Sequence, residues 1–352
     1  MKYITVLITD THFGTHNSSL TWLKSQKEFF DKQLIPHLKK LKKDGYLVRL
    51  IHCGDVFDSR STINTYIATT VVDLFSQICE IVDKFYIVAG NHDYYSPEAD
   101  DVDTVRLIFR QLELKYGYSC FNVISQRKFS DSWCEDGKDV DLFVPWYEWI
   151  KHDDLVEYLE NFRNNPDRDP ETDITHIFTH ADLVREGTDI ECPNIISGHI
   201  HTPYFKDNIK NLGSVFALTF TDNNSERGFY EYEPGGELKF IENTESIRFW
   251  RFYDDEILKI PEYLKKDDYI ELYITKSNIT KKKYTDAWSE WVNEFKNIWR
   301  FPRDVYGDDE SEKINIKQFE GYNIETMTES LIPDELKDKF EKVKQYINTN
   351  KD

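Results

Sequence analysis

Long apolar runs are missing from this sequence, and cysteine is scarce. No apolar stretch approaches the roughly 20 residues that a membrane-spanning helix needs, so we expect no membrane contact. The start, "MKYITVLITDTH", turns polar too early for the apolar core of a secretion signal. The five cysteines are scattered and never spaced as C-x-x-C, which argues against a disulfide framework or a zinc knuckle. Free thiols of this kind are typical of a protein that works in the cytoplasm.

Positive charge is also in short supply. Lysine and arginine number 44 against 64 aspartate and glutamate residues, which leaves a net charge of −20. This excess of negative charge argues against a protein that coats nucleic acid non-specifically. Hydrophobic residues make up 39% and aromatic residues 15% of the 352 positions, enough for a substantial core and about two domains.

The first two-thirds of the chain repeats one pattern, in which a short apolar run ends in polar residues and a helical segment follows. "YITVLITDTH" precedes a helical segment at about 20–43, interrupted at Pro36, and "YLVRLIHCGD" precedes another at about 64–84. "KFYIVAGNHD" is a third such run. Strands that alternate with helices predict an α/β fold with a partly parallel sheet. We also expect a hairpin ending in "VDLFVPW", a helix at about 153–162, and two strands paired through "EPGGE".

Five of the apolar runs end in clusters of histidine, aspartate and asparagine. The clusters are Asp10-Thr-His12, Gly54-Asp55 with Asp58, Gly90-Asn91-His92-Asp93, His180, and Gly198-His199-Ile-His201. The carboxyl ends of parallel strands face a common crevice, so we expect these side chains to meet. Oxygen and imidazole ligands without cysteine suit manganese, iron or zinc, and the set is large enough for two ions.

Each cluster has a simpler interpretation when it stands alone. "GNHD" could be an ordinary turn, "GHIH" an exposed strand end, and His180 a structural histidine. The D-x-H pair is by itself a weak signal. The ordered combination, with each cluster at the end of an apolar run, is what favours a metal site.

In this order the motifs D-x-H, G-D-x-x-D, G-N-H-D, H and G-H-x-H resemble the signature of calcineurin-like metallophosphoesterases, over roughly residues 1–240. The resemblance implies the metallophosphoesterase fold, an α/β sandwich, with a small α+β capping domain and a C-terminal helical segment after it. It also implies two divalent ions, expected to be Mn²⁺. The first ion would be held by Asp10, His12, Asp55 and His201, and the second by Asp55, Asn91, His180 and His199.

The same resemblance assigns roles to the residues beside the expected ligands. His92 would protonate the leaving oxygen or stabilise charge on the phosphoryl group, and Asp93 would orient it. Asp58 would orient a neighbouring ligand. A water between the metals would attack phosphorus in line.

Within this superfamily the chain is most similar to the SbcD-type DNA repair nucleases, and its length is closer to the compact bacteriophage members. The similar stretches are "GDVFDSR", "DLFVPWYEW" and "NLGSVFALTFTDNNSERGFYEYE". This similarity implies a manganese-dependent exonuclease or endonuclease that acts on DNA in repair or recombination. It implies an SMC-like, SbcC-type ATPase partner that carries much of the DNA binding. It also implies a homodimer within a heterotetramer, with the dimer interface at about 63–75 and 97–109.

We expect three parts in the chain: a nuclease domain at 1–244, a capping and DNA-binding domain at 245–325, and a C-terminal helix at 326–352. A helical face in the second part is predicted to form its core rather than a platform for stacked bases; it contains Trp288, Trp291, Phe295, Ile298 and Trp299. The last helix carries an apolar stripe that could pack on its own domain or bind the ATPase partner; it contains Leu336, Phe340, Val343 and Ile347.

Two other functions compete with the nuclease. A phosphatase or cyclic-nucleotide phosphodiesterase of the same superfamily would need no DNA, and the acidic charge agrees with it. Its small substrate would give little use to the C-terminal third of the chain. A non-catalytic scaffold is the other alternative, and the complete set of expected ligands argues against it.

Overall fold

The computed structural model of the chain describes residues 1–96, 99–134, 139–169 and 171–303. The chain divides into two compact units, Met1–Pro302 and Arg303–Asp352. The helix expected at 326–352 and the end of the second expected part, 304–325, lie outside the described residues. Within the described residues, no helix combines the length and apolar character needed to cross a bilayer.

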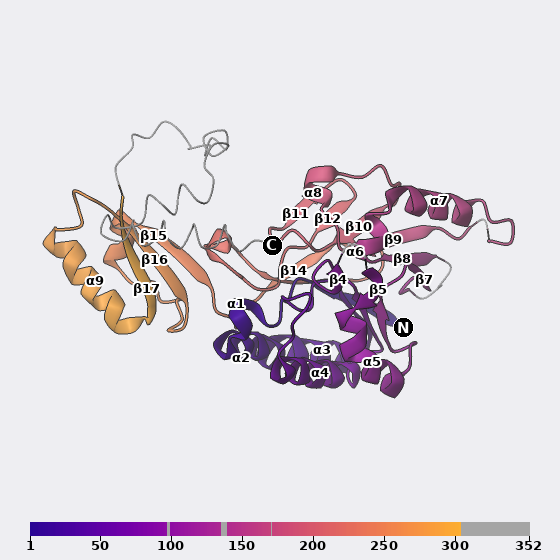
Figure 1. The fold of residues 1–352 in the computed structure, drawn as a ribbon, viewed down its shortest axis with the longest axis horizontal. Coiled ribbons are helices and arrows are strands. Elements are labelled where there is room, and N and C mark those ends of the chain that lie inside the picture. Colours follow the sequence, from indigo (N-terminus) through magenta and orange to yellow (C-terminus); the bar gives the residue numbers. More distant parts are fainter. Residues whose placement is uncertain (97–98, 135–138, 170, 304–352) are drawn as a thin grey trace, which may run out of the picture. The chain divides into compact units, whose positions relative to one another are not determined.

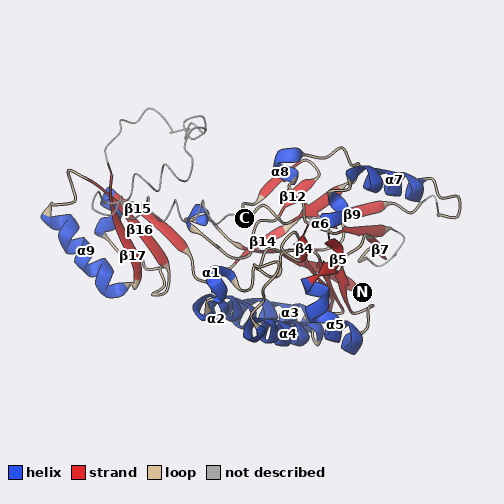
Figure 2. Ribbon diagram, in the orientation of Figure 1, coloured by secondary structure: helices blue, strands red, loops and turns tan. Residues whose placement is uncertain are grey.

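Two six-stranded sheets form the centre of the first unit (Figures 1 and 2). The first sheet has the order β14-β13-β1-β2-β3-β6, with β1, β2, β3 and β6 parallel. Its strands are β1 (Lys2–Ile8), β2 (Tyr46–His52), β3 (Lys84–Val88), β6 (Phe121–Ile124), β13 (Gly228–Tyr232) and β14 (Lys239–Glu242). The pair β13–β14 is antiparallel, as the turn "EPGGE" predicts.

The second sheet has the order β11-β12-β10-β9-β8-β7, and β8, β9, β10 and β12 are parallel. Its strands are β7 (Lys128–Asp131), β8 (Val140–Val144), β9 (Ile174–Thr179), β10 (Asn194–Ser197), β11 (Tyr204–Lys206) and β12 (Ile209–Asn211). The expected hairpin is the antiparallel pair β7–β8. The mixed sheets and their helices confirm the α/β class.

Helices cover the outer faces of these two sheets, so the part of the first unit that contains them is a four-layer sandwich (Figure 2). Alternation along β1 divides its side chains: Ile4 and Val6 pack among the helices, while Leu7 packs against the second sheet. The helices are α1 (Thr15–Ser18), α2 (Leu20–Phe29), α3 (Ile35–Lys43), α4 (Thr65–Cys79), α5 (Thr104–Tyr116), α6 (Trp146–Trp149), α7 (His152–Arg163), α8 (Leu183–Glu186) and α9 (Lys282–Glu294). A short hairpin, β4 (Tyr94–Ser96) with β5 (Ala99–Asp103), precedes α5.

The helical segment expected at 20–43 is interrupted, as predicted. Between α2 and α3 the chain makes a π-helical turn at Phe30–Leu34, and Pro36 lies in the first turn of α3. The backbone stays helical from α2 through this turn into α3, so the wider π turn is the local distortion that accompanies the proline, whose ring and missing N–H disturb a regular helix. The expected helices at 64–84 and 153–162 are α4, which ends earlier at Cys79, and α7.

Residues 249–303 form a small three-stranded sheet with one helix, and part of the expected helix here was wrong. The strands are β15 (Phe249–Tyr253), β16 (Tyr269–Thr275) and β17 (Asn297–Arg303), in the order β15-β16-β17. Because α9 ends at Glu294 and Phe295 is extended, Ile298 and Trp299 lie on β17 and not on the helix. Trp291 is fully buried in the core of this part, as expected, but Trp299 is 42% exposed.

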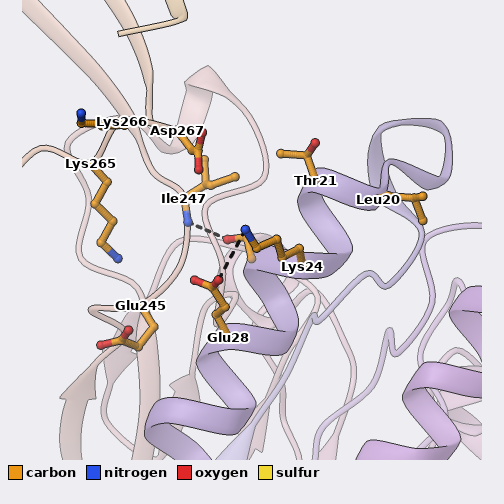
Figure 3. Close-up of a pocket in the computed structure, with 10 residues that line it drawn as sticks. Leu20, Thr21, Lys24, Glu28, Glu245, Ile247, Lys265, Lys266 and Asp267 are labelled. Carbon is orange, nitrogen blue, oxygen red and sulfur yellow. Dashed lines mark hydrogen bonds and ion pairs between the residues drawn. The ribbon is translucent and has the colours of Figure 1, made fainter. Parts of the chain in front are cut away.

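A groove of about 390 Å³ runs between α2 and the segment that leads into β15 (Figure 3). The dashed contact at Ile247 is the bond from its backbone N–H to Ser25 Oγ, at 2.8 Å. Beside it the ring of Trp22 stacks on Phe249, with 5.5 Å between centroids. Charges of both signs line the groove, because Lys24 and Lys265 face it together with Glu28. This balance of charge gives the groove no preference for an anion or a cation.

Candidate metal centre

All seven expected ligands follow the carboxyl ends of strands that meet at one edge of the sandwich. In the first sheet, Asp10 and His12 follow β1, Asp55 follows β2 and Asn91 follows β3; in the second sheet, His180 follows β9, and His199 and His201 follow β10. The structure therefore brings the two sheets' strand ends together in one cluster, as the motif order predicts.

The cluster contains two groups of ligand atoms that could each hold a metal ion. Asp10, His12 and His201 form one group, and Asp55, His180 and His199 form the other, with the ligand atoms of each group within 4.8 Å of one another. These groups correspond to the two expected ligand sets. A third group joins His12 and Asp55 to His92, so Asp55 lies between the two sets.

Asn91 completes the second group. Its side-chain amide lies 3.1 Å from His180 Nε2 and 2.8 Å from His199 Nδ1. One orientation of the amide points its nitrogen at these two rings and at Asp55 Oδ2, 3.2 Å away, so the groups can satisfy one another without an ion. The Nδ1 of His180 donates to the Cys53 carbonyl at 2.7 Å, and its Nε2 faces Asn91 and Asp55. The set fits a divalent ion through its chemistry, because amide oxygen, carboxylate and imidazole are all ligands that such ions accept.

His12 provides a second observation that fits a metal. Both its ring nitrogens are buried and have no hydrogen-bond partner. The nearest carboxylate oxygens are Asp58 Oδ1, at 3.4 Å from Nδ1, and Asp55 Oδ2 and Asp10 Oδ1, at 3.6 and 3.8 Å from Nε2. Leaving buried polar atoms unpaired costs about 1–3 kcal/mol each, so this arrangement is expensive unless a ligand completes it.

The electrostatics of the cluster separate the aspartates from the histidines. Burial alone would raise the pKa of Asp10, but His12, His180 and His201 lower it to about 2. Burial alone would lower the pKa of His12, but Asp10, Asp58 and Asp55 raise it to about 10, and Asp55 and Asp10 raise that of His180 to about 9. Without metal, protons on these two imidazoles balance the carboxylates. Divalent ions would take the place of those protons.

Asp93 does not have the role that we expected. Its carboxylate accepts from three backbone N–H groups, those of Gly90 at 2.8 Å, Asp55 at 2.9 Å and Val56 at 3.1 Å. It therefore fixes the loop that carries Asp55. The His92 ring is held elsewhere, because its Nδ1 donates to the backbone carbonyl of Asp58. The expectation that Asp93 orients the His92 ring is corrected accordingly.

Asp58 supports two neighbours through different atoms. Its backbone carbonyl holds His92, and its carboxylate lies 3.4 Å from His12 Nδ1. The second contact agrees with the expectation that Asp58 orients a ligand. The backbone N–H of His92 in turn donates to Asp55 Oδ1 at 2.8 Å, so the His92 loop also holds Asp55.

The backbone of the cluster is strained. Asp10, His12, Asp55 and His199 all have positive φ angles, of 50°, 44°, 55° and 79°. Residues other than glycine pay about 1–3 kcal/mol for such a conformation and keep it only where the surrounding contacts enforce it. Strain of this kind gathers at functional sites, which agrees with the location of the cluster.

Glycines before the ligands are the part of the site that our sequence reasoning missed. A Cβ at Gly90 would lie 2.3 Å from Asp55 Oδ1, and one at Gly198 would lie 2.0 Å from Thr9 Oγ1 and 2.7 Å from Asp10 Oδ2. Both glycines let a carboxylate ligand approach the backbone. The repeated glycine in "CGD", "GNH" and "GHIH" was the available signal.

Comparison with known proteins agrees with this site. The sequence profile of the calcineurin-like phosphoesterases matches residues 5–203. No curated protein matches the chain. One solved structure covers 69% of this chain and all of its own, at 13% identity and a TM-score of 0.38. Another, a protein of unknown function from Aquifex aeolicus, covers 57% of this chain and 80% of its own, at 16% identity and a TM-score of 0.26.

The chain belongs to the calcineurin-like phosphoesterase family, because the profile spans more than half of its length and includes all seven expected ligands. Members of this family hydrolyse phosphoesters with divalent metal ions. The protein is therefore a metal-dependent phosphoester hydrolase, and the groups around Asp10 and Asp55 are its candidate metal-binding residues.

Proposed function

We propose that the protein is a manganese-dependent DNA nuclease, the catalytic subunit of an SbcD-type complex with an SMC-like ATPase. The observation that carries the proposal is the pair of ligand groups with Asp55 between them, the arrangement that brackets one phosphoryl group with two ions. The sequence similarity to SbcD-type nucleases supports DNA as the substrate. The sheet and helix at 249–303 add a part beyond the family match, which ends at residue 203.

In this proposal Asp10, His12, Asp55 and His201 hold one ion, and Asp55, Asn91, His180 and His199 hold the other. Two bound ions would supply Lewis acidity toward the scissile phosphate and lower the pKa of the attacking water. The absence of cysteine from the ligand set favours manganese over softer metals. The two ions would also offset negative charge where the substrate phosphate binds.

His92 donates the proton to the leaving oxygen. Its Nδ1–H bonds to the Asp58 carbonyl, so Nε2 is the ring nitrogen left to act on the substrate. The ring lies against that of His12, with 5.0 Å between centroids, which keeps it beside the first ligand group. His92 therefore has the position that a general acid needs, and in this role it would enter the reaction with a second proton, on Nε2.

The ATPase partner and a second copy of the chain are parts of the same proposal. The net charge of −20 makes a partner that binds DNA useful, because the isolated chain repels the backbone phosphates. Exposed apolar side chains occur on the helices expected at the dimer interface: Tyr66 on α4 is 63% exposed and Leu107 on α5 is 78% exposed. A cytoplasmic location is also part of the proposal, and the five free cysteines support it.

The test is cleavage of linear duplex DNA by the isolated protein with manganese, magnesium or chelator. We expect manganese-dependent degradation, which is lost in a His92→Ser variant. A His37→Ser variant is the matched control, because His37 lies on α3 and bonds to Glu231 rather than to the metal cluster. Failure of the wild type to cleave DNA, both alone and with its ATPase partner, would contradict the nuclease assignment.

A phosphatase or cyclic-nucleotide phosphodiesterase is the second candidate, and the acidic charge is the observation that favours it. It predicts manganese-dependent hydrolysis of a small aryl phosphodiester without any DNA cleavage. Rates on both substrates, measured with the same preparation, separate the two functions. Inactivity on both substrates would support the scaffold alternative.

A further inference from the structure

The end of the sandwich opposite the metal cluster holds a cavity that the phosphoesterase chemistry does not use. It has a volume of about 240 Å³ and lies between the starts of β9 and β10, strand β12 and the turn from β13 to β14. Its polar lining comes from Thr175, His176, Asn194, Lys210 and Tyr232. The four residues from His176 to His180 span roughly 13 Å of extended chain, which separates the cavity from the metal ligands.

Lys210 faces this cavity without an acidic partner among the described residues. Its Nζ donates to Asn194 Oδ1, and the lining contains no carboxylate. Lys42, which is also partly buried, is by contrast paired with Asp83 at 2.6 Å. Burial lowers the pKa of Lys210, which shows that its charge is poorly solvated. The Lys210 ammonium group is half-buried and has N–H donors beyond the one bonded to Asn194, so binding of an anion beside it would be favourable.

His176 forms a rigid wall of the same cavity. Its Nδ1 lies 3.0 Å from Asp141 Oδ1, and its ring packs between those of Phe178 and Tyr232, at 5.7 and 5.2 Å. The Arg49 guanidinium, 2.6 Å from Asp141 Oδ2, keeps that carboxylate ionised. An ionised carboxylate only accepts, so Nδ1 carries the proton. Nε2, on the opposite edge of the ring, is therefore an acceptor.

Asn194 fixes the position of the lysine. Its Nδ2 donates to the Thr175 carbonyl at 3.1 Å, which turns Oδ1 toward Lys210. Asn194 and His176 are directly paired across β9 and β10, so their side chains share one face of the sheet. The Lys210 ammonium group and the His176 ring, which would contact a ligand, are thus held in position by strand pairing and hydrogen bonds before any ligand binds.

We propose that this cavity binds a small oxyanion of the hydrogen phosphate class, with Lys210 as the counter-ion and His176 Nε2 as the acceptor for its hydroxyl proton. Hydrogen phosphate and phosphate monoesters near neutral pH carry both anionic oxygens and, in part, an O–H group. Sulfate and chloride carry no such donor. The volume is sufficient for inorganic phosphate or for a small phosphate monoester.

The test is thermal unfolding of the full chain in chelator, with phosphate titrated against sulfate and chloride at constant ionic strength. We expect phosphate to raise the Tm with the logarithm of its concentration above the Kd, as specific binding to the folded state does, and sulfate to need at least tenfold higher concentration for the same rise. Inorganic phosphate and a nucleoside monophosphate are titrated separately, and the one that acts at the lower concentration identifies the source of the phosphate group.

The variants locate the response. Lys210→Met should lose the phosphate-dependent rise in Tm, and Lys206→Met should keep it, because Lys206 is exposed on β11 and does not line the cavity. Asp55→Asn should also keep it, which separates this site from the metal cluster. Binding stoichiometry from calorimetry serves as a second readout if Lys210→Met is unstable. A phosphate response that Lys210→Met retains, a calorimetric stoichiometry other than one phosphate per chain, or an equal response to sulfate would each overturn the proposal.

Discussion

Two regions of the sandwich bury aspartate beside histidine, yet their surroundings differ. In the first region, within the strands, Asp141 of β8 has hydrogen-bond partners for both carboxylate oxygens. Its Oδ2 accepts from Arg49 Nη1 at 2.6 Å. Its Oδ1 lies 3.0 Å from His176 Nδ1 and accepts from Thr175 Oγ1 at 2.9 Å. The φ angle of Asp141 is not among the positive ones. Every charge here has a protein partner in regular structure, which is the pattern of a group that holds the fold together.

The metal cluster shows the opposite pattern. His12 is buried with both nitrogens unpartnered, and Asp10 and Asp55 lie on backbone of positive φ. The backbone there is strained, and buried polar atoms lack hydrogen-bond partners. A buried charge alone therefore does not mark a functional site. Buried ligand atoms without partners on strained backbone do mark one.

The largest effect that we expect is from Asp55→Asn. Asp55 lies in two of the three ligand groups, so its loss should weaken both proposed ions and lower manganese-dependent hydrolysis by more than about 100-fold. The metal-free variant should still fold, because Asn keeps the shape of Asp55 and the Asp10 carboxylate still offsets the charge on the neighbouring imidazoles. Hydrolysis of an aryl phosphodiester and manganese stoichiometry by calorimetry measure the effect. Normal stoichiometry would contradict the bridging role of Asp55.

Asp141→Asn should show the reverse combination. Breaking a buried ion pair costs about 3–5 kcal/mol in the free energy of unfolding, because Arg49 is left without its partner. The fully buried Asp141 and Arg49 make this estimate applicable, and the metal ligands stay untouched. Denaturant unfolding measures the loss, and manganese affinity of the folded variant should be unchanged. An equal loss of manganese affinity would mean that the two regions are not independent.

The same pair gives the stability a pH dependence of known sign. Burial would raise the pKa of Asp141, but Arg49 and His176 hold it well below its usual range. A lowered folded-state pKa stabilises the protein above the unfolded value of about 3.9 and ceases to do so as pH falls below it. The wild type should therefore lose more stability between about pH 4 and pH 2 than Asp141→Asn does.

The sequence could predict the ligands better than the partners that hold them. Each ligand follows an apolar run, and that is a local signal that survives any arrangement of the sheets. The Arg49–Asp141 pair joins residues 92 positions apart, and no local pattern connects them. Asp93 was misassigned for a related reason, because its partners are backbone N–H groups that carry no sequence identity.

The C-terminal ends of helices were predicted least well from the spacing of apolar residues. The aromatic spacing through Trp291 and Phe295 continues to Ile298 and Trp299 with helical period, although the chain becomes extended at Phe295. Pairing within the sheet β15-β16-β17 decides that outcome, and periodicity in one segment cannot report it. The helix expected at 64–84 likewise ended early, at Cys79.

Gly90→Ala should lower manganese affinity on the order of 100-fold while the protein remains folded. The new Cβ would lie 2.3 Å from Asp55 Oδ1 and 2.4 Å from the Asp55 backbone nitrogen, so the carboxylate must move. Gly236→Ala is the matched control, because Gly236 likewise has no positive φ and a Cβ there meets nothing nearer than the Glu233 carbonyl oxygen at 3.1 Å. Calorimetric titration with manganese compares the two. Similar affinities in both variants would contradict a role for close packing at Gly90.

Manganese affinity should rise with pH through the neutral range. In the metal-free protein the pKa values of His12 and His180 are raised to about 10 and about 9, so both imidazoles hold protons at pH 7. Each proton displaced by metal contributes up to about tenfold in affinity per pH unit below its pKa. Titrations at pH 6.5, 7.5 and 8.5, in buffers of different ionisation enthalpy, give the affinity and the protons released. An affinity independent of pH would contradict ligation by these two histidines.

The smallest effect should come from Asp58→Ala. The Asp58 carboxylate is 38% exposed and 3.4 Å from His12 Nδ1, so its loss should weaken manganese binding by about tenfold, at the lower end for groups that orient ligands. The His92 ring bonds to the backbone carbonyl of Asp58, which alanine keeps. We therefore expect kcat at saturating manganese to be close to that of the wild type, whereas His92→Ser should lower kcat at any manganese concentration. A fall in kcat for Asp58→Ala that excess manganese does not restore would show that the carboxylate also acts on His92.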